Sequence, residues 1–478
     1  MSDKTIAKKY LADQKGYFEE VSEYIYRHPE TRFEEYTSAK YLAEQCEQQG
    51  FTVERGIGGI ETAFVGTFGS GSPVIGFLGE FDALSGLSQE PNKTAYEPWE
   101  NDVGHGCGHN LLGTGAFAAA CATKKYLEEN NLPGTVKFFG CPGEEGGSGK
   151  TFMVREGVFD GVDVALCWHP SPTNSIMSLS SLANYQVYFR FRGTPSHAAN
   201  SPHLGRSALD AVELMNTGVN YLREHVIPEA RMHYAVTNTG GISPNVVQAD
   251  AEVLYLIRAP KVNQVDDIFK RVCKIAEGAA LMTETELSME FDKACSNYIP
   301  NRHLERILYE NLEEAGIEEP TEEEKTFAKG IWESLSAGEQ EAYLGVMKGF
   351  GYEGDGEEFN GKYLSDVISP YVESDKILAG STDVADVSWV VPTAQLSAST
   401  STLGTPLHTW QMTSQGISSY AHKGMLRAAE SMALTGIDVL NDKDKLAEIK
   451  QEFEAFKAKN PYTCPIPKDV KPSPLNQG

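Results

Sequence analysis

The sequence predicts an α/β protein with a mixed, largely parallel sheet flanked by helices and with an inserted α+β domain. Between residues 51 and 167, short apolar runs bounded by turns alternate with helical segments, as in parallel strands joined by helices. Near Ala183 the pattern changes to the alternation of apolar and polar residues that marks strands with one face in water. A chain of 478 residues also exceeds a single core, which stops growing at about 250 to 300 residues. We therefore expect two or more domains.

The first part of the main domain is expected to cover residues 1–182. Apolar residues at near-helical spacing predict helices over residues 10–26 and 37–49, and Gly50 closes the second. The elements expected after them are strands at 51–53, 62–68, 73–78, 136–139 and 162–167 and helices at 111–129 and 150–156. Strands and helices in this order build a sheet covered on both faces.

Three polar clusters stand where these strands end. Glu80 and Asp82 follow one strand, residues 141–145 follow another, and His169 follows a third. Ligands of such sheets bind beyond the carboxyl ends of the strands, so the clusters are candidates for one site.

An inserted α+β domain is expected over residues 183–298. The strand at its start alternates Val187, Phe189 and Phe191 with Tyr188, Arg190 and Arg192. A helix at 206–225, a strand at 249–257, a helix at 262–280 and a strand at 287–291 follow. This is the right size for a small second domain.

The main domain is expected to resume at residue 299 and to continue to residue 478. It includes an acidic segment at about 313–358, in which Thr321 and Glu324 have the spacing of a capping box before a helix. We interpret its charge as a solvated helical face rather than a binding tail.

Composition argues against several classes of partner. Acidic residues outnumber basic ones by 67 to 41, and a net charge of -26 repels phosphate backbones and anionic headgroups. We therefore expect neither nucleic acid nor membrane binding. The first residues contain no apolar stretch of signal-peptide length, and the eight cysteines have no disulfide-framework spacing. A cytoplasmic location is expected.

The segment GHGCGHNLLG contains three potential metal ligands, His105, Cys107 and His109, within five residues. Glycines allow the backbone to wrap closely around an ion. The alternative is a reduced cysteine with two turn histidines.

The segment GCPGEEGGSG places Glu144 and Glu145 side by side at the end of an apolar strand. Adjacent side chains on an extended chain point in different directions, so one could bind a metal while the other faces its water. An ordinary favourable charge before a helix is the competing interpretation.

Two further histidines, His169 and His408, follow a strand and occupy a turn, respectively. Each alone is more typical of an ordinary hydrogen-bonded histidine. Together with the earlier candidates, the potential ligands are Cys107, His109, Glu145, His169 and His408. They supply N, S and O donors for a borderline divalent metal, and more than four donors indicate two ions. Asp82 could orient a histidine ligand or be a turn residue.

The chain contains, in order, the motifs GEFDALSGL, GHGCGHNLLG, CPGEEGGSG, CWHP, GTPSHAANSP, GGISPNVVQA, LYLIRAP, GSTDVADVSW and GTPLHTW. In this order it resembles the aminoacylase and glutamate-carboxypeptidase family of dinuclear metallopeptidases, in its amidohydrolase branch. The resemblance covers nearly the whole chain and implies a zinc-peptidase-like catalytic domain with an inserted lid and dimerisation domain. It implies that the five donors above bind metal and that Glu144 is the general base.

The resemblance also implies roles for the inserted domain. His197 matches a histidine that enters the active site of the partner subunit, so catalysis would need a dimer. Asn245 and Arg258 match positions that bind substrate oxygens, although Arg258 could be an ordinary surface arginine. Asn110 departs from the Asp of many relatives, and an amide cannot supply the same negative charge near the metal pair.

The function implied is cleavage of the amide bond of p-aminobenzoyl-glutamate, a substrate with a free carboxylate, by two divalent ions. The thiolate favours Zn²⁺ and the resemblance favours Mn²⁺. The alternatives are an aminoacylase-like hydrolase of another N-acyl or N-aroyl amino acid or dipeptide and a non-catalytic metal-binding partner subunit. The assembly is expected to be a homodimer or a heterodimer with a related A subunit.

Overall fold

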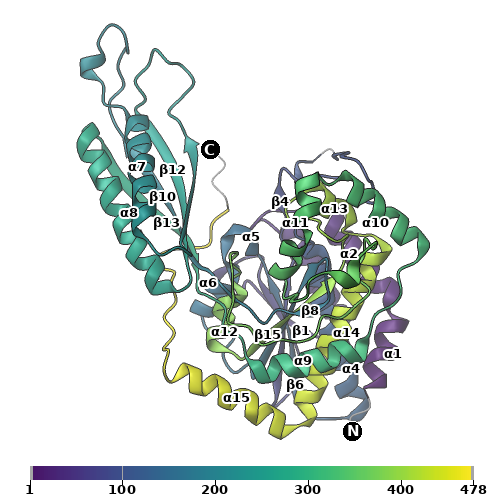
Figure 1. Cartoon of the computed structure of the whole chain (residues 1–478). Coiled ribbons are helices and arrows are strands. Elements are labelled where there is room, and N and C mark those ends of the chain that lie inside the picture. The colour runs from purple at the N-terminus through teal and green to yellow at the C-terminus, as the bar shows by residue number, and fades with distance from the viewer. Residues whose placement is uncertain (1–3, 100, 475–478) are drawn as a thin grey trace. The chain divides into compact units, whose positions relative to one another are not determined.

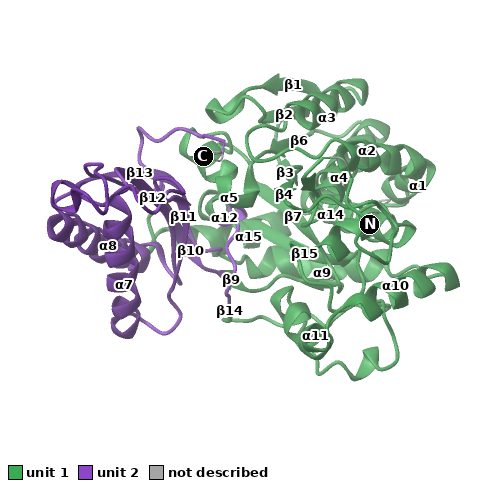
Figure 2. Cartoon of the chain, turned by 90° about the horizontal axis from the view of Figure 1, so that it is seen from above, with its two compact units in different colours: residues 1–180, 299–376, 386–462 green, residues 181–298, 377–385, 463–478 purple. Residues whose placement is uncertain are grey.

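The computed structural model describes residues 4–99 and 101–474, which form two compact units (Figure 2). Unit 1 contains residues 4–180, 299–376 and 386–462, and unit 2 contains residues 181–298, 377–385 and 463–474. Residues 377–385 and 463–474, which the sequence pattern assigned to the main domain, thus group with unit 2.

The main sheet of unit 1 has seven strands in the described residues, in the order β1-β2-β6-β3-β7-β15-β8. The strands are β1 (Thr52–Arg55), β2 (Phe64–Ser70), β6 (Gly134–Cys141), β3 (Val74–Glu80), β7 (Val164–Ser171), β15 (Thr393–Ser399) and β8 (Ser175–Ile176). The pairs β6–β3, β3–β7 and β7–β15 are parallel, and the outer pairs are antiparallel. The predicted mixed, largely parallel sheet is confirmed. Its central strands are almost wholly buried, as expected when helices cover both faces.

Helices cover this sheet on both sides (Figure 1). The helices of unit 1 are α1 (Thr5–Asp13), α2 (Lys15–Arg27), α3 (Tyr36–Gln48), α4 (His109–Asn130), α5 (Glu144–Gly147), α6 (Gly149–Arg155), α9 (Arg302–Ala315), α10 (Glu322–Ser334), α11 (Ala337–Gly349), α12 (Val384–Val390, its first residues in unit 2), α13 (Trp410–Gln415), α14 (Ser419–Asn441) and α15 (Lys443–Lys457). Helices α4 and α14 pack on each other and on the central strands, whereas α6 and α12 lie across the sheet from them (Figure 1). Gly113 allows α4 to approach closely, because a Cβ there would lie 2.5 Å from the Glu80 carbonyl oxygen. The start of α4 is therefore held against the end of β3.

The prediction of one continuous helix over residues 10–26 is wrong, because these residues belong to the two helices α1 and α2. The chain breaks at Gln14, which has φ −102° and ψ 10° and donates its backbone N–H to the Tyr10 carbonyl. The buried residues Leu11 and Phe18 remain in helical phase on both sides. A one-residue break of this kind leaves the apolar periodicity intact.

Unit 2 contains a four-stranded antiparallel sheet in the order β11-β12-β10-β13. Its strands are β11 (Arg231–Asn238), β12 (Asp250–Ala259), β10 (Ala183–Arg192) and β13 (Glu286–Cys295), and its helices are α7 (Ala208–Leu222) and α8 (Val262–Thr283). The helices pack on each other and on the sheet. The edge strand β11 was not predicted, although Met232, Tyr234 and Val236 alternate with other residues along it. Only Met232 of these is buried.

The remaining strands are two residues long and form two two-stranded sheets. β4 (Leu84–Ser85) pairs with β5 (Val103–Gly104), and β9 (Ser180–Ser181) pairs with β14 (Ile377–Leu378). The acidic segment after α9 folds around its own apolar cluster of Met347, Tyr352 and Phe359, which also includes Leu403. Its helix α10 begins with the predicted capping box, in which the Thr321 hydroxyl accepts the Glu324 N–H and the Glu324 carboxylate accepts the Thr321 N–H.

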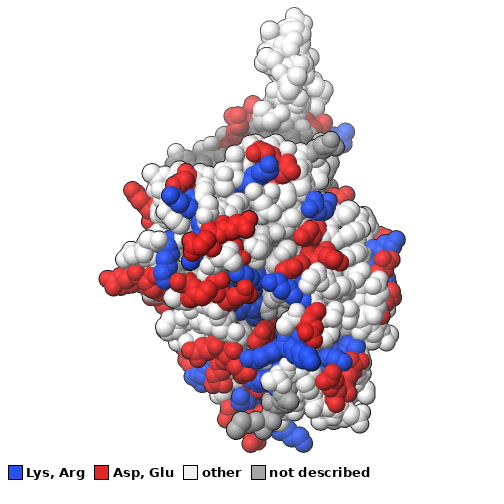
Figure 3. Space-filling view, turned by 90° about the vertical axis from the view of Figure 1, so that its right-hand side faces the viewer, with Lys and Arg blue, Asp and Glu red and all other residues white. Residues whose placement is uncertain are grey.

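Charged side chains of both signs are interspersed on the face drawn in Figure 3. In the described chain, several helices carry i,i+4 ion pairs, such as Lys124–Glu128 and Lys125–Glu129 on α4. In each of these two pairs, a lysine neutralises the charge of one neighbouring glutamate. Among the residues that the structure describes, no helix is both long enough and apolar enough to cross a bilayer.

Candidate metal centre

Three neighbouring strands bring polar side chains to one edge of the main sheet. Strand β3 ends at Glu80, β6 leads through Cys141 to Glu144, and β7 carries His169 near its end. Because the sheet order is β6-β3-β7 and Glu80 lies beside Cys141 in the parallel register, these chain ends are adjacent. The clusters expected at strand ends therefore meet.

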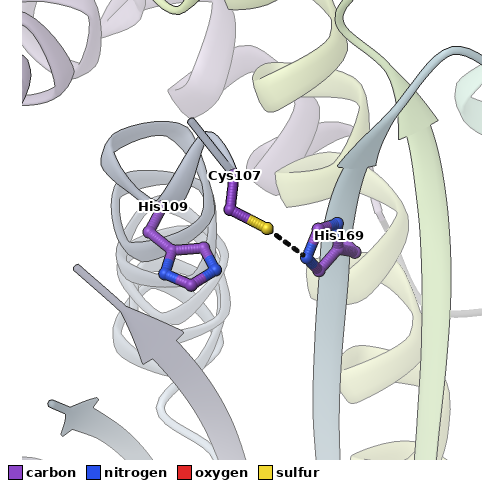
Figure 4. A group of neighbouring side chains, drawn as sticks. All are labelled: Cys107, His109 and His169. Atoms are coloured by element: carbon purple, nitrogen blue, oxygen red, sulfur yellow. Dashed lines mark hydrogen bonds between the residues drawn. The ribbon is translucent and has the colours of Figure 1, made fainter. Parts of the chain in front are cut away.

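The first donor group contains Cys107, His109 and His169, whose ligand atoms all lie within 4.8 Å of one another. The Cys107 Sγ points to His169 and lies 3.5 Å from its Nε2 (Figure 4). His169 Nδ1 lies 2.7 Å from the Pro170 carbonyl oxygen and must donate to it. That bond puts the proton on Nδ1 and leaves the Nε2 lone pair directed at the group.

His109 is held by a carboxylate on the opposite side of its ring from the group. Its Nδ1 lies 2.9 Å from Asp82 Oδ1, and the ring is fully buried. Its Nε2 has no hydrogen-bond partner among the described residues. A buried imidazole nitrogen that makes no hydrogen bond and has a thiol and a carboxylate beside it is suited to binding a metal ion, and a carboxylate behind the ring is the usual support of a metal-binding histidine.

A second donor group contains Cys107, Glu145 and His408, again within 4.8 Å. His408 Nε2 lies 3.1 Å from Glu145 Oε1. The His408 N–H donates to the Gly106 carbonyl, 2.9 Å away, so the late turn is tied to the Cys107 turn. Cys107 belongs to both groups, which makes its sulfur the atom that could join two metal positions.

A third group contains Glu80, His109 and Glu144. Glu80 Oε2 lies 3.4 Å from His109 Nε2, and its Oε1 lies 2.7 Å from the Lys150 Nζ. Glu80 and Lys150 are almost fully buried. Sequence reasoning noted Glu80 only as part of a cluster and missed Lys150, because a lysine in a short helical segment gives no sign of burial.

The charges of the site depend on one another. Burial raises the pKa of the Cys107 thiol well above its usual value, and the Glu145 carboxylate raises it further. Burial also acts to raise the pKa of Glu145, but the hydrogen bond from His408 and the charge of His109 bring it down to about 2. The hydrogen bond to Glu145 in turn raises the pKa of His408. A cation placed here would favour the thiolate, because its charge replaces the missing solvation.

Two residues near these groups have other partners. His105 is buried with its Nε2 3.1 Å from the Ile25 carbonyl oxygen, and burial lowers its pKa to about 3. The Asn110 amide donates to the Ser22 hydroxyl, 3.0 Å away, and to a backbone carbonyl, 2.8 Å away. Neither residue belongs to a donor group among the described residues.

The three remaining candidates, His197, Asn245 and Arg258, belong to unit 2. The exposed His197 accepts the N–H groups of Ala199 and Asn200 at Nδ1, at 3.2 and 3.1 Å, so its neutral ring carries the proton on Nε2. The Asn245 carbonyl accepts the Ala198 N–H, 3.0 Å away, so its turn lies beside that of His197. Arg258, near the end of β12, donates to the Ala379 carbonyl at 3.4 Å.

The donor set fits a divalent metal: a thiol, imidazole nitrogens and carboxylates converge around a buried nitrogen that lacks a hydrogen bond among the described residues. The profile of peptidase family M20/M25/M40 matches residues 76–465. The chain belongs to this family.

Relatives of this M20/M25/M40 chain agree with that membership. It is 55% identical over 471 residues to the B subunit of p-aminobenzoyl-glutamate hydrolase from Escherichia coli (strain K12), with 97% of each chain covered. It is 28% identical over 256 residues to the A subunit of that hydrolase from the same organism, covering 50% of this chain and 57% of the relative. An aminobenzoyl-glutamate utilization protein from Klebsiella pneumoniae has the same fold, with a TM-score of 0.59 at 16% identity over 90% of this chain and 98% of that one. The chain is a metal-dependent amidohydrolase.

Proposed function

We propose that the chain hydrolyses the amide bond of p-aminobenzoyl-glutamate to p-aminobenzoate and glutamate. The relative named for this activity is similar over nearly the entire length of both chains. The observation that carries the proposal is the meeting of the two donor groups at Cys107, whose five residues come from four separate segments of the chain between positions 107 and 408. Cys107, His109 and His169 would hold one ion, and Cys107, Glu145 and His408 a second.

The ions are Mn²⁺ or Zn²⁺ in this proposal. When bound, they would lower the pKa of a water molecule and polarise the scissile carbonyl. Asp82 holds His109 in the tautomer that leaves Nε2 for the metal. Lys150 balances the charge of Glu80 beside this position, since Lys150 and His109 together keep the pKa of Glu80 low despite its burial.

Glu144 acts as the general base. It directly precedes the ligand Glu145 and lies within 4.8 Å of His109 and Glu80 at its carboxylate. It takes the proton of the attacking water as the water oxygen bonds to the carbonyl carbon, and it passes that proton to the leaving nitrogen as the C–N bond breaks.

Three residues of unit 2 have proposed roles toward the substrate. His197 of the partner subunit donates from Nε2 to the oxygen that gains negative charge, which is consistent with an Nδ1 that already accepts two backbone N–H groups. Arg258 and Asn245 bind the free carboxylate of the substrate, and the planar guanidinium suits bidentate pairing. The active assembly is a dimer, either of this chain or of this chain with an A subunit, since a relative of that name exists.

The aromatic part of the substrate has a candidate neighbour in Phe350. Its ring centroid lies 5.5 Å from that of His169, with the planes tilted by 34°. Hydroxyls of Ser175 and Ser397 donate to the Phe350 carbonyl at 2.6 and 2.9 Å, which fixes the residue beside the site. This favours an aroyl amide over the acyl amides of an aminoacylase-like enzyme.

We also propose that the protein works in the cytoplasm. None of its eight cysteines forms a disulfide within the described chain, as in proteins of reducing compartments.

The test is to purify the chain alone, load it with Mn²⁺ or Zn²⁺, and measure released p-aminobenzoate. We expect metal-dependent release, which disappears on chelation and returns with added metal. Equal rates on a panel of acetyl and benzoyl amino acids would favour the aminoacylase-like alternative. Activity that appears only once an A subunit is added is expected for either kind of partnership. If Glu144→Gln in this chain left the activity of that mixture unchanged, the alternative of a non-catalytic partner would be favoured.

A further inference from the structure

The loop between α2 and α3 lies against the turn that carries Glu144 and Glu145. Three of its side chains, Arg32, Phe33 and Glu35, are buried, and Glu35 is fully so. None of them is a member of a donor group in the described part of the chain. A buried carboxylate and a buried guanidinium are expensive to maintain, so the use of their hydrogen bonds is informative.

Glu35 binds the residue directly before the acidic pair. Its Oε1 accepts the Gly143 N–H at 2.8 Å, and its Oε2 accepts the Thr62 hydroxyl at 3.0 Å. The carboxylate therefore spans from the entrance of β2 to the turn after β6.

Arg32 binds the residue directly after the acidic pair, because its Nη1 donates to the Gly146 carbonyl. Phe33 lies between the two polar residues and packs on the same turn. A Cβ at Gly143 would come within 2.6 Å of the Phe33 ring, and one at Gly147 within 2.9 Å. Phe33 itself has φ 61°, an uncommon value for a non-glycine residue, which bends the loop toward the turn.

The turn needs such support, because its backbone is irregular. Gly143 and Gly146 have φ of 68° and 80°, and Ser148 has φ 55°. Between the two glycines, the Glu145 N–H donates to Asp82 Oδ2 at 2.7 Å. The backbone is thus fixed before, within and after the acidic pair.

We propose that Glu35 and Arg32 are positioning residues with different targets: Glu35 fixes the general base Glu144, and Arg32 fixes the metal ligand Glu145. The assignment rests on the proposed function of those two carboxylates. It follows from position, since Gly143 adjoins Glu144, whereas Gly146 adjoins Glu145. Each support therefore acts mainly on the carboxylate nearest to it.

Glu35 is tested by the variants Glu35→Ala and Glu35→Gln. A misplaced base slows the chemical step, so Glu35→Ala should lower kcat about 100-fold with little change in KM and with the metal content retained. Glu35→Gln keeps an oxygen that can accept the Gly143 N–H, so it should restore most of kcat. Steady-state kinetics and elemental analysis of the same preparations supply these values.

Arg32 is tested by Arg32→Met, which keeps most of the bulk and removes the donors. Metal affinity should fall about tenfold or more, while kcat at saturating metal stays close to that of the wild type. Glu34→Gln is the matched control, since Glu34 lies in the same loop and bonds to Thr31 within it. Its kinetics and metal affinity should be unchanged.

The outcomes separate the two proposals. Unchanged kcat in folded Glu35→Ala protein overturns the assignment. The assignment is also overturned if Glu35→Ala and Arg32→Met lose kcat, metal affinity and thermal stability equally and Glu35→Gln restores none of them. If Glu35→Ala does not fold, Gly143→Ala takes its place, because a methyl group there strains the turn against Phe33; unchanged kcat in that variant would also overturn the assignment. A wild-type protein that binds metal without hydrolysing the amide contradicts the proposed function instead, and the Arg32 effect on metal affinity remains measurable.

Discussion

His109 takes its orientation from one neighbour. The Asp82 carboxylate bonds to its Nδ1, and the other oxygen of that carboxylate accepts the Glu145 N–H. Asp82 therefore contacts a residue of the first donor group and a residue of the second, although it belongs to none of the three groups among the described residues. Small polar residues behind a site of this kind decide how well the donors are aimed.

We expect Asp82→Ala to lower metal affinity about 10- to 100-fold, because His109 loses its fixed tautomer and the Glu145 backbone loses its acceptor. Metal titration of the apo-protein measures this loss. Asp160→Asn changes an exposed carboxylate and should bind metal like the wild type. Equal affinities of the Asp82 variant and the wild type would contradict the role given to Asp82.

Glu144→Gln is expected to lower turnover by about 10² to 10⁴, since an amide cannot take the proton of the attacking water. Metal content should stay at the wild-type value, because Glu145 rather than Glu144 shares a group with Cys107. Released p-aminobenzoate measures the turnover, and elemental analysis measures the metal content. Glu129→Gln, an exposed change on α4, is the control; retained turnover in Glu144→Gln would remove Glu144 from the role of base.

Much of the candidate site could be predicted from residue types and spacing. Cys107, His109 and Glu145 stand in glycine-rich turns, and the structure groups them as the motifs suggest. Lys150 could not be found in this way, because its role arises from a buried ion pair with Glu80, which is distant in sequence. Asn110 is the reverse case: it stands next to His109 in sequence, but its amide bonds to Ser22.

At the scale of the elements, five of the seven strands of the main sheet were predicted, because buried strands are continuous apolar runs. The short β8 and the interior β15 were not. β15 is wholly buried, but its sequence TAQLSAS is rich in Thr, Gln and Ser, so no apolar run marks it. The break at Gln14 and the edge strand β11 were also not predicted. The break leaves the helical phase unchanged. In β11, Met232, Tyr234 and Val236 do alternate with other residues, so a strand signal was present that sequence reasoning missed. The strand pairs with β12 on one side, and Tyr234 and Val236 are exposed.

The segment between α11 and β14 supplies the most specific element-scale prediction. Phe350→Ala removes the ring. It should lower the ratio of kcat/KM for benzoyl-glutamate to kcat/KM for acetyl-glutamate about two- to tenfold, which corresponds to the usual interaction free energy of an aromatic pair. Val372→Ala, an exposed change in the same segment, should leave that ratio unchanged. A ratio that Phe350→Ala does not alter would contradict the aromatic contact with substrate.

At the scale of the whole molecule, the proposed action of His197 across a dimer can be tested by mixing inactive chains. In a symmetric dimer of Glu144→Gln with His197→Ala, one site keeps its own Glu144 and receives an intact His197. Random mixing should therefore restore about a quarter of wild-type activity. Differently tagged chains, refolded together and purified through both tags, allow the mixed dimers to be assayed. No activity in those dimers would contradict action from one chain on the site of the other.

Cys107 is common to both donor groups, and this links the fate of the two ions. In the proposed two-ion centre, the Cys107 sulfur is the ligand that both positions share, so its oxidation to a sulfenic or sulfinic acid would weaken both positions in a single event. A partly oxidised preparation would then contain molecules with two intact metal positions and molecules in which both are weakened.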